Sequence, residues 1–173
     1  YVFWFAIIIA LSQFTISIAN FKFNLLFDEI VTDKLLKVRY LGKLYSAVNL
    51  TSLIIQILFI PIFYKYIKNK HVHFFLPLFY LFMTIIGFTL GGNFLLPVAS
   101  TFVLFKGLDY SLLNVAKELI YFPLNNFQKY GAKYLCDILV YRSSKGMVSF
   151  LLIFFQSDKI IMTALYIFLG LWF

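Results

Sequence analysis

The sequence predicts an all-α integral membrane protein with six transmembrane helices, and three observations lead to this class. Of the 173 residues, 62% are hydrophobic and only 13% are charged, whereas a soluble domain carries roughly 25% charged residues. The mean hydropathy is +0.91. Uncharged segments also recur at lengths close to the roughly 20 residues that a helix needs to cross a bilayer. We therefore expect a multi-pass protein in the lipid bilayer.

The first two expected spans each carry a stripe of uncharged polar side chains. Residues 1–21 and residues 44–64 contain no charge and are long enough to cross. Asn20 lies on the polar face of the first, and Asn49 and Gln56 lie on that of the second, because residues at these spacings recur on one side of a helix. Such side chains either contact a solute or bond to neighbouring helices, and the pattern alone does not decide between these roles.

Charged segments flank the second span. Residues 28–43 mix acidic and basic side chains, and we expect them to form a connection at the membrane surface. Residues 65–73 are interpreted as a short basic loop that contains His71 and His73. Two histidines without a third ligand are weak evidence for a metal site, so we predict an interfacial role for them and no bound metal.

The uncharged run of residues 74–105 contains the third span and most of the fourth. At about 1.5 Å per residue the run is too long for one crossing and too short for two. Gly91 and Gly92 supply a turn in its middle. We therefore predict spans over residues 74–90 and from residue 94 to about residue 122, which places the charges after residue 105 at membrane depth.

The C-terminal third of the chain is expected to hold two further spans. A polar connection at residues 125–133 precedes a fifth span over residues 134–155, and a turn at residues 157–159 leads into a sixth that starts at residue 160. The chain begins and ends inside apolar runs. We therefore interpret residues 1–173 as a single six-helix bundle and as a fragment of a longer chain.

The charged and aromatic side chains of the fourth and fifth spans form the candidate site. A charge at the bilayer centre costs about 2.5–3.5 kcal/mol on insertion scales and usually faces a bundle interior or a water-filled path. Lys and Arg would attract a polyanion, carboxylates would exchange partners when it arrives, and Tyr rings would stack on a flat ring. The alternative is a set of structural ion pairs. On these two spans the substrate-binding candidates are Lys106, Lys117, Arg142, Lys145, Tyr121 and Tyr141, and the gating or ion-pair candidates are Asp109, Glu118 and Asp137. Asn20, Asn49 and Gln56 on the polar faces of the first two spans are further substrate-binding candidates.

Other functional classes lack support in the sequence. It contains no P-loop, HExxH or GxSxG motif, so we predict neither an enzyme nor a cofactor. The net charge of +8 is spread over loops and helices rather than gathered on one face, which argues against nucleic acid. An anionic lipid or anionic solute is the better partner class. Cys136 is the only cysteine, so no intrachain disulfide forms.

Four segments in chain order carry a resemblance to a known family. They are residues 20–24 (NFKFN), residues 42–56 with Gly42, Ser46, Asn49, Ser52 and Gln56, residues 109–124 with DYSL, KE and YFPL, and residues 137–146 with Asp137, Arg142, Lys145 and Gly146. Together these segments resemble the motifs of the non-mitochondrial ATP/ADP translocases, the nucleotide transport proteins of intracellular bacteria, plastids and microsporidia. Ser144 departs from that pattern, because a glycine is common at its position.

The resemblance implies a fold, a function and a partner. The fold is a major-facilitator-like bundle of twelve helices, of which this chain would be the second half and the missing N-terminal half the partner. The function is exchange of ATP for ADP, or nucleotide import, in a bacterial inner membrane or a plasma or organelle membrane of a eukaryotic host. Lys117, Glu118, Arg142 and Lys145 match motif positions for phosphate binding and gating. A carrier of another organic anion and a transport-inactive scaffold subunit remain alternatives.

Overall fold

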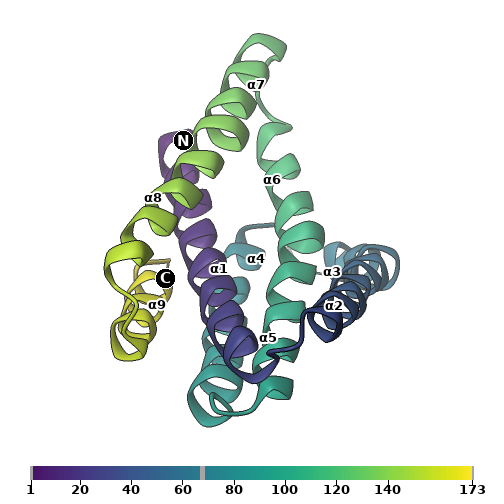
Figure 1. Cartoon of the computed structure of the whole chain (residues 1–173). Helices are drawn as coiled ribbons and strands as arrows, with labels where there is room; N and C mark the ends of the chain where they lie inside the picture. Colours follow the sequence, from purple (N-terminus) through teal and green to yellow (C-terminus); the bar gives the residue numbers. More distant parts are fainter. Residues whose placement is uncertain (1, 67–68, 173) are drawn as a thin grey trace. The chain divides into compact units, whose positions relative to one another are not determined.

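The computed structural model describes residues 2–66 and 69–172, and within these ranges it contains helices and no strand (Figure 1). Helix takes in 92% of the residues, which confirms the all-α prediction. In chain order the α-helices are α1 (Val2–Ile30), α2 (Lys34–Ile54), α3 (Ile60–Tyr66), α4 (Asn69–Met83), α5 (Leu95–Leu108), α6 (Asn114–Tyr121), α7 (Asn126–Lys133), α8 (Tyr141–Phe154) and α9 (Asp158–Trp172).

Within the described ranges, four π-helical segments connect or extend these helices. They are η1 (Ile55–Phe59), η2 (Thr84–Leu90), η3 (Asp109–Leu113) and η4 (Tyr134–Val140). In such a turn the backbone N–H bonds to the carbonyl five residues back, and turns of this kind are frequent at functional sites. Three candidate site residues lie in them: Gln56 in η1, Asp109 in η3 and Asp137 in η4.

Among the described residues, four continuous helical stretches are long and apolar enough to cross a membrane. They are Val2–Ile30, Lys34–Tyr66, His71–Leu90 and Leu95–Tyr121, and they contain the described residues of the first four predicted spans except at the margins. The stretch of residues 126–154, which carries the predicted fifth span, is not among them. Neither is α9, whose 15 residues fall short of the roughly 20 that a crossing needs. Six spans therefore stay a prediction.

The predicted connection at residues 28–43 is wrong in its extent, because almost all of it is helical. Helix α1 continues to Ile30 and α2 begins at Lys34. The Asp33 carboxylate accepts hydrogen bonds from the backbone N–H groups of Leu35 at 2.7 Å and Leu36 at 3.1 Å. An aspartate in this N-cap position satisfies donors that a helix start leaves open, so the helix begins ten residues earlier than the uncharged run indicated.

The predicted connection at residues 125–133 is also mostly helical. The Asn125 side chain accepts a hydrogen bond from the backbone N–H of Gln128 at 2.9 Å and so starts α7. The predicted turn at residues 157–159 is shorter than expected, because α9 already begins at Asp158. In the predicted loop at residues 65–73, α4 starts at Asn69, and residues 67–68 lie outside the described residues.

The chain divides into two compact units, each described by itself. The first takes in the described residues up to Lys22 and from Lys117 onward. Its core at one end joins α1, α6, α7 and η4 through Phe5, Ala6, Ile9, Tyr121, Ala132 and Cys136. The rings of Phe5 and Tyr121 meet edge to face, with centroids 5.5 Å apart. In a bilayer such contacts stabilise through van der Waals packing, since lipid is as apolar as the core.

The second unit spans Phe23–Ala116, and α5 packs against both α2 and the α4–η2 stretch in it. Tyr80 on α4 donates a hydrogen bond to the Phe105 carbonyl at 3.3 Å, and the two rings lie 4.4 Å apart. On the α2 side, a Cβ added at Gly107 would lie 2.8 Å from Thr51 Cγ2. Small residues of this kind let two membrane helices approach closely.

Candidate functional site

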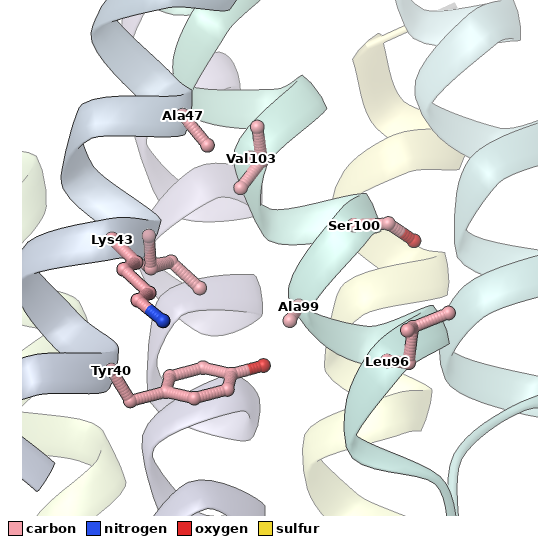
Figure 2. Close-up of a pocket in the computed structure, with 8 residues that line it drawn as sticks. Tyr40, Lys43, Ala47, Leu96, Ala99, Ser100 and Val103 are labelled. Carbon is pink, nitrogen blue, oxygen red and sulfur yellow. The ribbon is translucent and has the colours of Figure 1, made fainter. Parts of the chain in front are cut away.

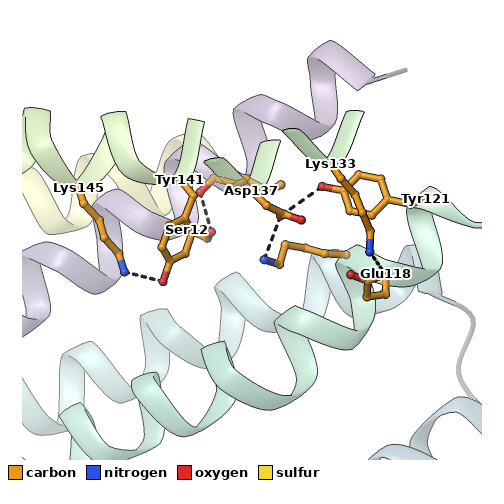
Figure 3. A network of polar contacts seen from close by, with 9 residues as sticks. Ser12, Glu118, Tyr121, Lys133, Asp137, Tyr141 and Lys145 are labelled. Atoms are coloured by element: carbon orange, nitrogen blue, oxygen red, sulfur yellow. Dashed lines mark hydrogen bonds and ion pairs between the residues drawn. The ribbon is translucent and has the colours of Figure 1, made fainter. Parts of the chain in front are cut away.

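The site in the first unit is centred on Asp137 (Figure 3). Lys117 Nζ donates to Asp137 Oδ1 at 3.4 Å, and Tyr121 Oη donates to the same oxygen at 3.3 Å. Lys117 and Tyr121 are four residues apart on α6, so they share one face of the helix. Both distances lie beyond the usual 2.5–3.2 Å range. Asp137 therefore balances the charge of Lys117 without a short hydrogen bond.

Glu118 has a different partner. Its Oε2 lies 2.8 Å from Lys133 Nζ, which ties the end of α6 to the end of α7. The Lys133 ammonium also lies 5.7 Å from the centroid of the Tyr121 ring, within the range of a cation–π contact. The sequence-based prediction missed Lys133, because it assigned residues 125–133 to a connection. A prediction that began the helix at Asn126 would have placed Lys133 on the same helical face as Asp137, four residues later, and so among the candidates.

Tyr141 lies between two cations. Lys145 Nζ donates to Tyr141 Oη at 2.5 Å and lies 3.9 Å from the ring centroid. Lys117 Nζ lies 5.7 Å from the same centroid. An electron-rich ring next to two ammonium groups attracts both. The structure thus brings three of the candidate side chains together, Lys117, Tyr141 and Lys145.

The charges of the first unit do not balance. Its three acidic residues each form an ion pair: Glu118 with Lys133, Asp137 with Lys117, and Asp158 with Lys22. In the described part of the chain, neither Arg142 nor Lys145 forms an ion pair with a carboxylate. Arg142 is exposed and Lys145 is half-buried. These two cations on α8 therefore lack an anionic partner among the described residues.

The other candidates are distributed as follows. Asn20 is half-buried on α1 and belongs to the first unit, whereas Asn49, Gln56, Lys106 and Asp109 belong to the second. Asn49 is exposed on α2, and Asp109 is buried in η3.

Gln56 and Lys106 both contact Tyr110 in the second unit. The Gln56 amide donates to the Tyr110 carbonyl at 3.1 Å and to Ser52 Oγ at 3.4 Å. Lys106 Nζ lies 5.7 Å from the centroid of the Tyr110 ring. The Gln56 contacts favour the helix-packing alternative for this side chain, because its amide joins η1 to η3.

The fold and the site define the class of this chain as a helical protein in which several helices can cross a membrane. Among the residues described, no group of three His, Cys, Asp or Glu side chains is placed to hold a metal ion. Comparisons of the chain with protein-family models, curated proteins and solved structures found no match. The translocase resemblance therefore rests on its four sequence motifs.

Proposed function

We propose that this chain is part of a membrane carrier for an anionic solute, and that the solute is a nucleotide. The observation that carries the proposal is the charge balance of the first unit. All three of its carboxylates already hold a lysine, while Arg142 and Lys145 on α8 have no carboxylate partner among the described residues. In the proposed carrier the fifth span crosses the bilayer, and cations without a counter-ion at that depth are costly unless a solute or water satisfies them.

Phosphate chemistry suits this arrangement. A guanidinium binds phosphate oxygens in a bidentate manner and an ammonium binds them as a point charge, so Arg142 and Lys145 can share one phosphate group. Lys117 can join them, because its hydrogen bond to Asp137 is long at 3.4 Å. The anion then replaces Asp137 as the partner of Lys117, and the differential affinity for the two arrangements moves the protein between states.

Two features support a nucleotide rather than a small anion. Tyr141 places a half-buried aromatic ring beside Lys117 and Lys145, and such a ring can stack on a base or bond to a ribose, whereas the Tyr121 ring is buried in the core of the unit. The four motifs that resemble ATP/ADP translocases contain Lys117, Glu118, Arg142 and Lys145. We extend the proposal to the family fold, in which this chain is the six-helix second half of a major-facilitator-like carrier. Such a carrier needs an N-terminal half to form the other side of the substrate pathway.

The test is uptake of labelled ATP by liposomes that contain the complete protein. One set is preloaded with ADP and the other is left empty, and Lys117→Ala and Arg142→Ala are compared with the wild type. Lys129→Ala is the control, because Lys129 lies on α7 and forms no ion pair among the described residues. We expect preload-dependent uptake that both site variants lose and the control keeps.

Each other outcome has a definite meaning. Uptake that does not depend on preloaded ADP would replace exchange by import. Uptake that survives in Lys117→Ala and Arg142→Ala would move the site away from α6 and α8. If the well-inserted wild type takes up no nucleotide but does take up another organic anion, the substrate is that anion. If it takes up neither, the transport-inactive scaffold is the better interpretation.

A further inference from the structure

A hollow lies between α2 and α5 in the second unit, and none of the residues of the proposed nucleotide site lines it (Figure 2). Its volume is about 300 Å³, at the lower end of the range of ligand pockets. Seven of the eight residues around it are labelled in Figure 2. The lining consists of Tyr40, Lys43, Leu44, Ala47, Leu96, Ala99, Ser100 and Val103.

The polar groups gather at one end of the hollow. Figure 2 shows the Lys43 ammonium and the Tyr40 ring next to each other, with the Tyr40 hydroxyl directed toward α5. Aromatic packing fixes the Tyr40 ring, whose centroid lies 5.2 Å from that of the buried Phe27. No ion pair of Lys43 exists among the described residues. At this end of the hollow, the Lys43 ammonium and the Tyr40 hydroxyl are therefore both available to bind an anionic group.

The opposite end of the hollow is apolar. Ala47 and Val103 face each other there (Figure 2), and Leu44 and Ala99 continue the apolar lining. The two alanines create the space, because their side chains end at Cβ. Lys43 is also the last charged residue before the uncharged residues 44–64, so the boundary between headgroups and hydrocarbon falls at the polar end.

The start of α2 suits an anionic membrane surface. It carries Lys34, Lys37, Arg39 and Lys43 within ten positions of the sequence, and of these Lys37 is bound to Asp28 at 2.5 Å. Clusters of Lys and Arg next to a membrane helix attract anionic lipid headgroups. Exposed Leu35, Leu36 and Val38 are interspersed with these charges, as in helices that lie at the headgroup boundary.

We propose that this hollow is a binding site for one anionic phospholipid. The lipid phosphate lies at Lys43 and Tyr40, and the first part of one acyl chain lies over Ala47, Ala99 and Val103. The order of the lining, with a cation at the interface and small apolar residues below it, matches the order of groups along a phospholipid. A second copy of the chain or a partner helix would fill the apolar end without using the cation.

The experiment titrates phosphatidylglycerol and phosphatidylcholine into the delipidated complete protein in detergent and counts bound lipids by native mass spectrometry. Detergent removes the bulk surface charge of a bilayer, so the readout reports the individual site. Lys43→Gln is the main variant. Lys34→Gln is the matched control, because Lys34 lies on the same basic segment but does not line the hollow.

We expect the wild type to retain one phosphatidylglycerol in preference to phosphatidylcholine. Lys43→Gln should weaken phosphatidylglycerol binding about fivefold, the factor that corresponds to roughly 1 kcal/mol per Lys near a lipid surface, and weaken phosphatidylcholine binding less, because the choline cation of that lipid offsets its phosphate charge. Lys34→Gln should behave as the wild type. Ala99→Leu, which fills the hollow, should lower the binding of both lipids in protein that remains monodisperse with unchanged helical circular dichroism.

Three results would overturn the proposal. The first is equal phosphatidylglycerol binding by the wild type and Lys43→Gln. The second is displacement of the bound lipid by inorganic phosphate at millimolar concentration, which would make the site one for a free anion. The third is a dimeric wild type that Ala99→Leu converts to a monomer, which would make the occupant a second copy of the chain.

Discussion

Lys117 on α6 lies 3.4 Å from the Asp137 carboxylate in η4, and this ion pair is the central contact of the charged site. The two side chains are largely enclosed, with exposed fractions of 13% for Lys117 and 32% for Asp137. A pair of this kind can hold two helices in register or can open when an anion competes for the lysine. Both roles predict the same contact, so variants must separate them.

Uncharged replacements of Lys117 and Asp137 can distinguish a role in holding the helices in register from a role in binding an anion. Lys117→Met alone should lower stability by about 1–3 kcal/mol, because it leaves the Asp137 charge without its lysine. Adding Asp137→Leu should restore part of that loss, since replacing both partners of an enclosed ion pair by apolar groups is often close to neutral, while the Tyr121 hydroxyl loses the acceptor that it has in Asp137. Thermal unfolding in detergent measures both effects.

Transport should respond differently from stability in the same series. If Lys117 binds the solute, the Lys117→Met/Asp137→Leu double variant should be stable yet take up no nucleotide. Recovery of uptake together with stability would show that the pair serves only to fix the helices, and the phosphate-binding role of Lys117 would then be wrong.

The second ion pair of the site should contribute little to stability. Glu118 and Lys133 lie 2.8 Å apart, but their side chains are 49% and 35% exposed, and exposed pairs contribute about 0.2–1 kcal/mol. A double-mutant cycle with Glu118→Gln and Lys133→Gln should therefore give a coupling free energy in this range. A coupling free energy above about 2 kcal/mol would instead show that this ion pair is a major stabilising contact between α6 and α7.

Turns marked by glycine could be predicted from the sequence, whereas helix starts inside charged segments could not. Gly91 and Gly92 end the η2 stretch as the sequence indicated, and the Phe94 N–H donates to the Gly91 carbonyl at 2.9 Å. Asp33 and Asn125 both start helices, but they stand among other polar residues and their capping role is visible only from the backbone. The uncharged runs therefore located four membrane-length helices, but the helices predicted from these runs were too short.

The candidate site could also be predicted only in part from the sequence. The spacing of Asp137, Tyr141 and Lys145 placed them on one face, and the structure brings Tyr141 to both Lys145 and Lys117. The sequence could not show that neighbouring Lys117 and Glu118 have different partners. That depends on how the helix that begins at Asn126 lies against α6, and a pattern within one helix does not contain this information.

The ion pair between Lys22 and Asp158 should matter more for stability than the pair between Lys37 and Asp28. The Lys22 side chain is only 10% exposed and that of Lys37 is 27% exposed, while the two aspartates are similarly exposed at 64% and 67%. Asp158→Asn leaves a more enclosed ammonium without its counter-ion, and this cost grows with burial. We expect a clearly lower unfolding temperature for Asp158→Asn and a change near zero for Asp28→Asn, measured in one detergent at one pH.

Glycine substitutions provide a test of helix packing that does not depend on function. A Cβ at Gly87 would lie 1.8 Å from Thr101 Oγ1 and 2.8 Å from Thr101 Cβ, whereas a Cβ at Gly131 on α7 meets nothing within 4 Å. Gly131→Ala should raise stability by about 0.5–1 kcal/mol, because alanine favours a helix over glycine. Gly87→Ala should lower it by about 1–3 kcal/mol, since overpacking forces η2 away from α5.

Thr101→Ala in the Gly87→Ala background should restore part of the loss by removing Oγ1, while the remaining Cβ contact keeps the recovery incomplete. Thr101 Oγ1 also donates to the Pro97 carbonyl at 3.0 Å, so Thr101→Ala alone serves as the reference for that lost hydrogen bond. Unfolding temperatures of the four proteins complete the cycle. Equal stability of Gly87→Ala and Gly131→Ala would mean that η2 and α5 do not approach as closely as this packing requires.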